Sequence, residues 1–210
     1  MILHGYWRSG TAYRTRIALN LKGLTYDQAG VDLRQGDQKS AAYLALNPQG
    51  LVPALEVDGL VLTQSPAILE WLEETRPEPP LLPADATGRA RVRAMAALVG
   101  CDIHPLNNLR VLKALRESFD AAPAQTDAWA ARWITAGFAA LEALVADHGG
   151  GWTYGSTPSL ADCYLIPQIY SARRFHVALE AFPRLLAIES AAEAHPAFIA
   201  AHPDRQPDAD

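Results

Sequence analysis

A short stretch near the start of the chain decides the fold, and it reads Tyr6-Trp7-Arg8-Ser9-Gly10-Thr11-Ala12. The residues Ile2–Trp7 are apolar and aromatic, as a buried strand would be. The residues Thr11–Lys22 place apolar side chains at helical spacing and end at Gly23, a typical stop signal for a helix. The stretch is therefore predicted to be the turn that joins a first strand to a first helix.

The same alternation of strand and helix patterns continues to about Thr75. The further predicted elements are a strand over Thr25–Leu33, a helix over Ser40–Leu46, strands over Val52–Val57 and Leu60–Thr63, and a helix with Ser65 as its N-cap and Pro66 as its first residue. Between the last two strands, Asp58-Gly59 is the strongest short hairpin signal in the chain. The predicted order is β-α-β-α-β-β-α.

This order, with Val52-Pro53 opening the third strand, is that of a thioredoxin-like α/β domain. A proline cannot donate a hydrogen bond to a sheet, so it belongs at the start or the edge of a strand. We expect a cis Val52-Pro53 bond, which would leave the backbone of Val52 free to pair with an extended peptide.

A different composition follows the proline-rich segment Arg76–Pro83, because strand patterns nearly stop there. The segments with helical periodicity are Gly88–Ser118, Thr126–Asp147, Ser159–Arg174 and Pro183–Ala192. The residues Ser159 to Asp162 resemble a capping box with Asp in the usual Glu position. We expect two domains, a thioredoxin-like one over residues 1–79 and an all-α one over residues 87–210.

Composition limits the classes of partner. The 210 residues are half hydrophobic, the formal net charge is −5 and the pI is about 5.7, so there is no basic footprint for nucleic acid. The cysteines, Cys101 and Cys163, lack a metal-like or paired spacing, and we expect two reduced thiols packed in helices. The N-terminus lacks a signal-peptide pattern, and no apolar run is long enough to span a bilayer. These features predict a cytoplasmic protein with neither a metal nor a membrane partner.

The turn after the first strand carries the chemistry. A thioredoxin would have Cys-x-x-Cys here, whereas this chain has Ser9-Gly10-Thr11-Ala12, which excludes dithiol redox chemistry. Two hydroxyls at a helix N-terminus can instead donate hydrogen bonds to an anion such as a thiolate supplied by a ligand. The alternative is that Ser9 or Thr11 only caps the helix, and both roles can coexist. Gln64-Ser65 at the start of another helix offers donors for a carboxylate, so the pattern predicts a surface for a small acidic peptide.

The stretch Tyr6–Gly23 resembles the N-terminal signature of zeta-class glutathione transferases. Asn47–Pro53 and Gln64–Ile68 match the segments of that family that bind glutathione. Further similar segments are Asp102–Arg110, Ala161–Gln168, Ala172–Phe175 and Pro203–Asp208. The resemblance covers nearly the whole chain and implies the glutathione transferase fold.

The resemblance implies glutathione as a cofactor that is regenerated in each turnover, and a cis–trans isomerase activity. The thiolate would add to the cis double bond of a maleyl group and leave after rotation about the former double bond. Gly10 and Thr11 depart from the common Ser-Ser-Cys or Ser-Ser-Ala motif and resemble a branch of bacterial maleylpyruvate isomerases. Arg110 stands where animal-type maleylacetoacetate isomerases often have a small polar residue. Both departures favour conversion of maleylpyruvate to fumarylpyruvate, in aromatic catabolism of the gentisate type.

Three alternatives stay open. One is maleylacetoacetate isomerase of tyrosine catabolism, with the same chemistry on a longer diacid. The second is a general glutathione transferase, which needs an apolar pocket and no arginine cluster. The third, from another class, is a binding module with the transferase fold and no catalysis.

The resemblance also implies the site residues. Those expected to bind glutathione are Ser9, Gly10, Thr11, Gln38, Gln49, Val52, Pro53, Gln64, Ser65, Asp102, His104 and Asn108. Ser9 and Thr11 are the candidates for stabilising the thiolate. The substrate carboxylates are expected to bind Arg8, Arg110 and Arg174, because the planar fork of arginine suits carboxylates.

Some of these assignments have competitors. Arg173 competes with Arg174 for the substrate, and His104 either lines the glutathione site or packs. Arg14 and Arg16 are expected to be surface or structural residues of the first helix. The family implies a homodimer, in which Asp102 would reach glutathione across the subunit interface.

Overall fold

The computed structural model describes residues 1–209 and consists of two compact units. The first unit contains Met1–Leu81 together with Glu193–Asp210, and the second unit contains Leu82–Ala192. The break near residue 81 falls between the two expected domains. The C-terminal residues, however, pack with the first unit rather than with the helices that precede them. We propose that residues 79–87 link the two domains expected from the sequence.

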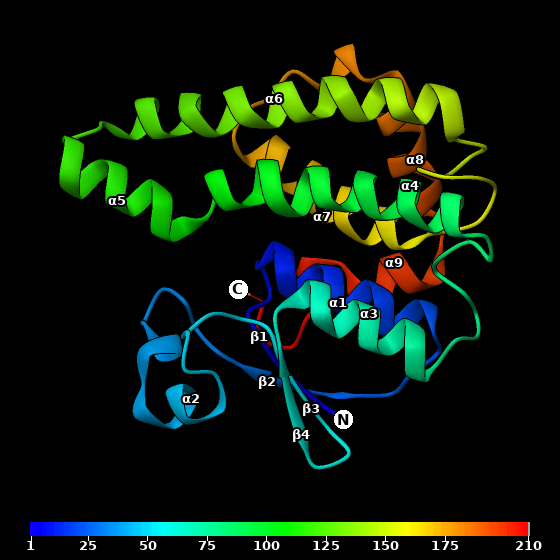
Figure 1. Ribbon diagram of the computed structural model, residues 1–210. Helices are drawn as coiled ribbons and strands as arrows, with labels where there is room; N and C mark the ends of the chain where they lie inside the picture. The colour runs from blue at the N-terminus through cyan, green and yellow to red at the C-terminus, as the bar shows by residue number, and fades with distance from the viewer. Residues whose placement is uncertain (210) are drawn as a thin grey trace. The chain divides into compact units, whose positions relative to one another are not determined.

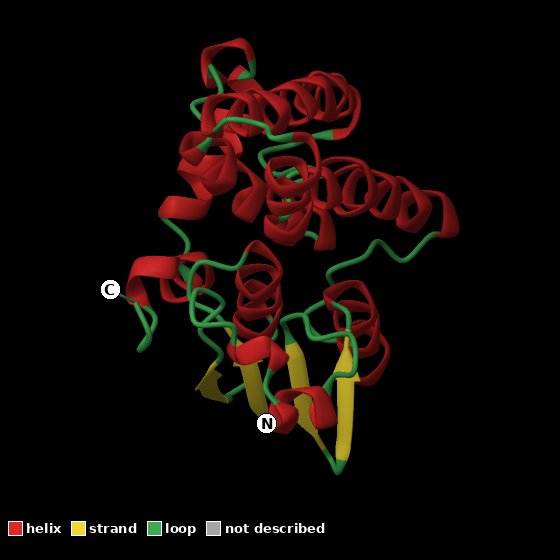
Figure 2. Cartoon of the chain, turned by 90° about the vertical axis from the view of Figure 1, so that its left-hand side faces the viewer, coloured by secondary structure: helices red, strands yellow, loops and turns green. Residues whose placement is uncertain are grey.

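The first unit is built on a four-stranded sheet (Figure 2). Its strands are β1 (Ile2–Gly5), β2 (Asp27–Gly30), β3 (Ala54–Val57) and β4 (Leu60–Thr63), in the spatial order β2-β1-β3-β4. β1 is parallel to β2 and antiparallel to β3, and β3 forms an antiparallel hairpin with β4. The predicted thioredoxin-like order is confirmed, and so is the cis Val52-Pro53 bond.

The helices of this unit begin and end close to the predicted residues. They are α1 (Gly10–Leu21), the 3₁₀ turn η1 (Asp37–Lys39), α2 (Ala41–Leu46), α3 (Ser65–Thr75), α9 (Pro196–Ala201) and the 3₁₀ turn η5 (Pro203–Arg205). The prediction for α3 was wrong by one residue: Ser65 is its first helical residue, and Gln64, at φ +66°, occupies the N-cap position. α9 was not predicted.

α1 is the central helix of the first unit. It lies beside both α3 and α9 (Figure 1), and every side chain from Ala12 to Leu19 is buried. Arg14 and Arg16 were expected to be surface or structural residues of this helix; the structure buries both.

Arg16 explains why the C-terminal segment belongs to this unit. Its Nε donates to the Ala201 carbonyl at 3.0 Å and its Nη2 to the Trp7 carbonyl at 2.9 Å. The backbone N–H of Trp7 donates to Asp208 Oδ2 at 2.9 Å. Directly before the Arg8–Ser9 turn, the carbonyl of Trp7 is thereby held by Arg16 of α1 and its N–H by Asp208 of the C-terminal segment.

The start of the linker is held by a buried ion pair. Lys22 Nζ lies 2.8 Å from Glu73 Oε2 and also donates to the carbonyls of Arg76 (2.7 Å) and Pro79 (3.1 Å). The same Glu73 oxygen accepts the N–H of Leu81 at 3.0 Å. All three ammonium protons therefore have an acceptor, which offsets part of the desolvation cost of burying the charge.

The second unit is helical, as predicted. Its elements are α4 (Ala86–Ala97), the π-helical turn η2 (Leu98–Ile103), the 3₁₀ turn η3 (His104–Leu106), α5 (Leu109–Phe119), α6 (Pro123–His148), α7 (Leu160–Arg174), the 3₁₀ turn η4 (Leu179–Ala181) and α8 (Pro183–Glu193). None of the helices described in residues 1–209 is long and apolar enough to span a bilayer.

The segment Gly88–Ser118, predicted from its helical periodicity, is helical but not one continuous α-helix, because the chain changes helical type between Leu98 and Leu106. This region lies against α6 at Gly137. A Cβ at Gly137 would stand 2.3 Å from the Ile103 side chain, so the close approach requires glycine there.

The predicted capping box of α7 is present. Asp162 accepts hydrogen bonds from the N–H and hydroxyl groups of both Ser159 and Thr153. Burial nevertheless raises the pKa of the Asp162 carboxyl. Cys163 is buried beside it, whereas Cys101 is exposed, contrary to the expectation that both thiols pack inside helices.

The buried ion pair gives a stability prediction. Lys22→Met should lower the free energy of unfolding in urea by about 3–5 kcal/mol, because it leaves Glu73 buried without its cation. Lys113→Met removes an exposed pair with Glu117 and should cost less than about 0.5 kcal/mol. The double variant Lys22→Met/Glu73→Leu should recover much of the loss. A single variant that is as stable as the exposed control would contradict this account of the linker.

Candidate functional site

The loop that leads to the cis proline is fixed by side chains from within the first unit. Tyr43 Oη donates to the Leu51 carbonyl at 2.7 Å, and Asn47 Nδ2 donates to the same oxygen at 2.6 Å. Burial raises the pKa of the Tyr43 phenol to about 12, so it remains a neutral donor at physiological pH. Gly50 has φ +61°, and a Cβ there would lie 2.8 Å from the Gln38 carbonyl. The loop therefore presents Val52 in a fixed position.

Ser9 and Thr11 tie the start of α1 to this loop. Thr11 Oγ1 donates to the Val52 carbonyl at 2.9 Å, and Ser9 Oγ lies 3.0 Å from Thr11 Oγ1. Ser9 also caps α1, because its Oγ accepts the N–H of Ala12 at 3.3 Å. A hydroxyl has one proton, and that of Thr11 is given to Val52. The Ser9 proton can go either to Thr11 Oγ1 or to a ligand, so capping and ligand binding coexist in this residue.

A second set of hydrogen bonds joins the start of α3 to the same loop. Gln64 Nε2 donates to Gln49 Oε1 at 2.5 Å. Ser65 is buried, and its Oγ accepts a hydrogen bond from Arg14 Nη1 at 3.1 Å. Sequence reasoning missed this role of Arg14. The strained backbone of Gln64, with positive φ at a residue other than glycine, is the kind of outlier that is found at ligand sites.

Two polar groups of this surface are ready for a peptide ligand. Within residues 1–209, the N–H of Val52 makes no hydrogen bond, and the buried Oε1 of Gln38 has no partner. Lys39, the residue after Gln38, has its Nζ 3.4 Å from the Gln49 carbonyl. An extended peptide with a carboxylate supplies the missing partners, because it has main-chain acceptors for Val52 and N–H donors for Gln38. The residues present therefore fit a small peptide such as glutathione.

Arg8 lies between Ser9 and Trp7, whose main-chain groups are both hydrogen-bonded. Its guanidinium carbon lies 5.3 Å from the centroid of the Trp7 ring, and the side chain is partly exposed. In the part of the chain that the structure describes, Arg8 has no hydrogen bond or ion pair to another side chain. Its guanidinium group can therefore donate hydrogen bonds to a carboxylate.

The other predicted residues belong to the second unit. Asp102, His104, Asn108 and Arg110 lie on the segment from η2 to the first turn of α5. Asn108 caps α5, since its Oδ1 accepts the N–H of Arg110 at 3.1 Å. Trp129 Nε1 on α6 donates to the Leu106 carbonyl at 2.9 Å and holds the segment. The Asp102 and Arg110 side chains are exposed.

The two arginines at the end of α7 make different contacts. Arg173 donates to both carboxylate oxygens of Glu189, with Nε at 3.0 Å and Nη2 at 2.5 Å. Arg174 lies with its guanidinium carbon 5.8 Å from the centroid of the Phe175 ring. The guanidinium group of Arg173 is thus occupied by Glu189, and both arginines stay candidates for the substrate.

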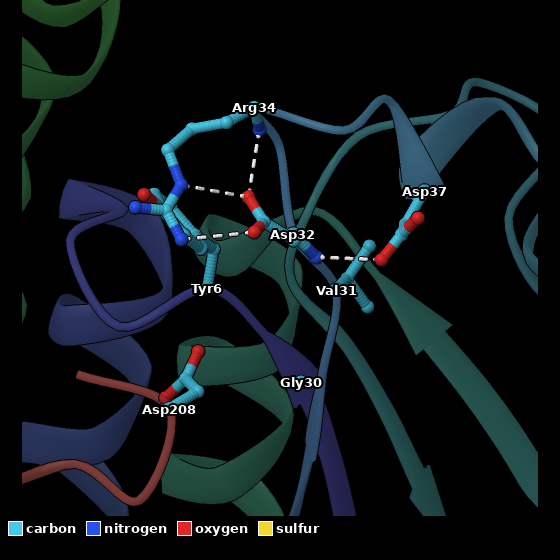
Figure 3. Close-up of a pocket in the computed structure, with 7 residues that line it drawn as sticks. All are labelled: Tyr6, Gly30, Val31, Asp32, Arg34, Asp37 and Asp208. Carbon is cyan, nitrogen blue, oxygen red and sulfur yellow. Dashed lines mark hydrogen bonds and ion pairs between the residues drawn. The ribbon is translucent and has the colours of Figure 1, made fainter. Parts of the chain in front are cut away.

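A separate cavity in the first unit was not predicted (Figure 3). It is lined by Tyr6, Gly30, Val31, Asp32, Arg34, Asp37 and Asp208. Arg34 folds back over the Tyr6 ring and holds Asp32 through two guanidinium nitrogens, at 3.1 and 2.9 Å. These bonds keep the pKa of the Asp32 carboxyl well below its usual range. With its arginine already paired and two further carboxylates in the wall, this cavity repels a diacid.

The chain matches two family models. The model for the N-terminal domain of glutathione S-transferases matches residues 8–75, and the model for their C-terminal domain matches residues 123–196.

Curated relatives match over nearly their full length. A maleylpyruvate isomerase from Ralstonia sp is 55% identical over 210 residues, which are 99% of each chain. A maleylacetoacetate isomerase from Pseudomonas aeruginosa is 53% identical over 99% of this chain and 98% of its own.

Solved structures agree with this. The holo structure of a maleylpyruvate isomerase, described as a bacterial zeta-class glutathione S-transferase, has a TM-score of 0.98 and 54% identity, with full coverage of both chains. A maleylacetoacetate isomerase from Anaeromyxobacter dehalogenans, with glutathione bound in its active site, has a TM-score of 0.90 and 50% identity over 100% of this chain and 97% of its own. The chain therefore belongs to the glutathione S-transferase family, in its zeta class.

Proposed function

We propose that this protein is a glutathione-dependent isomerase that converts maleylpyruvate to fumarylpyruvate. The observation that carries the proposal is the hydrogen-bonded set of Ser9, Thr11 and Val52, with the Val52 N–H open to a peptide. Two full-length matches named maleylpyruvate isomerase, at 55% and 54% identity, support this choice of substrate.

Glutathione would be held mainly by the first unit. Val52 and Pro53 offer a backbone edge, Gly10 a backbone N–H at the start of α1, and Gln38, Gln49, Gln64 and Ser65 their side chains. When bound, glutathione supplies a thiolate nucleophile for a carbon–carbon double bond.

Ser9 and Thr11 have different roles near the reacting sulfur. The hydroxyl of Ser9, at the N-terminus of α1, would donate a hydrogen bond to the thiolate of glutathione, where the helix dipole also favours negative charge. Thr11 acts as a positioning residue, because its proton is committed to the Val52 carbonyl. A hydrogen bond to the thiolate lowers the pKa of the thiol and so increases the reactive fraction at neutral pH.

Three arginines would bind the substrate. Arg8 stands next to Ser9 in the chain, and Arg110 and Arg174 belong to the second unit. The net charge of the protein is −5, so its overall field does not attract a diacid and local cations must do so. We further propose that Asp102, His104 and Asn108 contribute to the glutathione site.

We propose a cytoplasmic homodimer, in which Asp102 reaches glutathione bound to the partner subunit. The apolar side chains of Leu60 and Val61 on the edge strand β4 are 52% and 41% exposed. An uncovered apolar edge strand is a liability that a subunit interface would remove. Maleylacetoacetate is the second candidate substrate, because a relative named maleylacetoacetate isomerase is 53% identical over 99% of this chain.

The function is tested by turnover of maleylpyruvate with and without glutathione, while free thiol is measured. We expect no isomerisation without glutathione and no net loss of thiol with it, because the cofactor is released unchanged. A stoichiometric fall in free thiol would show conjugation instead. Binding of glutathione without turnover of either diacid would support a non-catalytic binding module.

Substrate preference gives a second prediction. Arg110→Ser should lower kcat/KM for maleylpyruvate by about tenfold or more, which corresponds to the loss of one charged hydrogen bond of about 1.5–3 kcal/mol. The loss for maleylacetoacetate should be smaller, because the longer diacid has more alternative contacts. Arg173→Ser removes an exposed charge of the same unit that is paired with Glu189 and serves as the control. Equal losses for both substrates would rule out a role of Arg110 in the preference.

A further inference from the structure

The turn between α4 and α5, residues 98–106, lies against α6 at a glycine (Figure 1). Gly137 stands in the interior of α6, where glycine is less favourable than alanine. A Cβ at this position would be 2.3 Å from Ile103 Cδ1 and 2.4 Å from its Cγ1. Ile103 is only 1% exposed, so it has little room to move aside. The glycine therefore allows an approach that no other residue at this position would allow.

A hydrogen bond from the same helix holds the far end of the turn. Trp129 lies about two helical turns before Gly137, and its Nε1 donates to the Leu106 carbonyl at 2.9 Å. Within the turn, the N–H of His104 donates to the carbonyl of Val99, five residues earlier, as in a π-helix. Such π turns are frequent at functional sites. The turn thus has a defined backbone shape and two attachments to α6.

The turn and the residues after it separate buried side chains from exposed ones. Ile103 and Asn107 are buried, four residues apart. Asp102 and Arg110 are exposed, and Asn108 is partly exposed. The Oδ1 of Asn108 accepts the N–H of Arg110 at 3.1 Å and caps α5. The start of α5, and with it the base of the Arg110 side chain, is therefore set by the way the turn is held.

We infer that Gly137 and Trp129 are positioning residues for the substrate, acting through this turn on Arg110. The inference rests on the proposed function, because it takes Arg110 as a residue that binds a carboxylate of the diacid. A guanidinium binds a carboxylate through a planar pair of donors, so the interaction depends on its orientation as well as its distance. A misplacement of about 1 Å caused far from the reacting atoms can lower a rate about a hundredfold.

The next residue of α6 shows that not every inward contact of this helix has such a role. Phe138 is 0% exposed and packs edge to face against Phe182, with 5.7 Å between the ring centroids. Neither phenylalanine belongs to the turn. Loss of packing there should lower stability and leave the position of Arg110 unchanged. Phe138→Leu is therefore a matched control for a purely structural effect.

The test is a double-mutant cycle on kcat/KM for maleylpyruvate, measured at saturating glutathione so that binding of the cofactor does not enter. Gly137→Ala should lower this constant about tenfold or more. In the Arg110→Ser background the same change should lower it less than about twofold, because the residue through which it acts has been removed. Phe138→Leu should lower the midpoint of thermal unfolding and change kcat/KM less than about twofold in both backgrounds.

Further variants test the two attachments. Gly137→Ala/Ile103→Ala lacks the atoms that the new methyl group would meet, so it should recover part of the lost activity. Trp129→Phe removes the indole N–H and should lower kcat/KM at least about threefold, with the same dependence on Arg110. It decides the question if Gly137→Ala does not fold, as judged by thermal unfolding. Backbone amides of residues 98–110 should exchange hydrogen faster in both single variants, a measurement that needs no turnover.

The outcomes separate this inference from the proposed function. Independent, multiplying losses in Gly137→Ala and Arg110→Ser would make Gly137 a purely structural residue and overturn the inference. No recovery in the variant that also carries Ile103→Ala, or unchanged hydrogen exchange, would do the same. In each of these cases, glutathione-dependent isomerisation by the natural protein would still support the function. Absence of isomerisation of either diacid by the natural protein would overturn both.

Discussion

The hydrogen bond from the Thr11 hydroxyl to the Val52 carbonyl joins the two segments on which the site depends. One is the N-terminus of α1, which offers the helix dipole and the Ser9 hydroxyl. The other is the loop before the cis proline, whose backbone can pair with a peptide. The hydroxyl that binds the thiolate and the backbone that binds the peptide must be held at a fixed separation. A nucleophile in a loose position loses most of the benefit of preorganisation. This bond sets that separation within one rigid unit.

Further hydrogen bonds that fix these segments come from side chains of α1 and of the C-terminal residues. α1 is buried at every position from Ala12 to Leu19, so its polar side chains point at other parts of the fold rather than at water. Arg14 reaches Ser65, and Arg16 reaches the turn before Ser9. Asp208 holds the other main-chain group of Trp7. The reactive turn is therefore fixed by the buried guanidinium of Arg16 and the partly exposed carboxylate of Asp208. Burying the charge of Arg16 would be costly without the carbonyls that accept its hydrogen bonds.

The sequence predicted those elements of the fold that are determined by neighbouring residues, such as turns and helix ends. The hairpin at Asp58-Gly59 and the helix stop at Gly23 were found because glycine adopts positive φ at both places. The break between α4 and α5 was missed, since the contact that requires it joins Ile103 to Gly137 on another helix. Thr11 and Val52 are 41 residues apart, so their bond could not be predicted from spacing. Arg14 was expected to be a surface or structural residue; its burial agrees with the structural alternative, and its bond to Ser65, 51 residues away, could not be predicted from spacing.

The central claim is that the Ser9 hydroxyl stabilises the thiolate while Thr11 holds the loop. It is tested most directly by ultraviolet titration of the thiolate of bound glutathione in the natural protein, Ser9→Ala and Thr11→Val. The natural protein should hold the pKa of the bound thiol below its value in free glutathione. Ser9→Ala should raise it by about one to two units, as expected for the loss of one donor worth about 1–3 kcal/mol. Thr11→Val should weaken glutathione binding more than it shifts this pKa. An unchanged titration in Ser9→Ala would contradict the account.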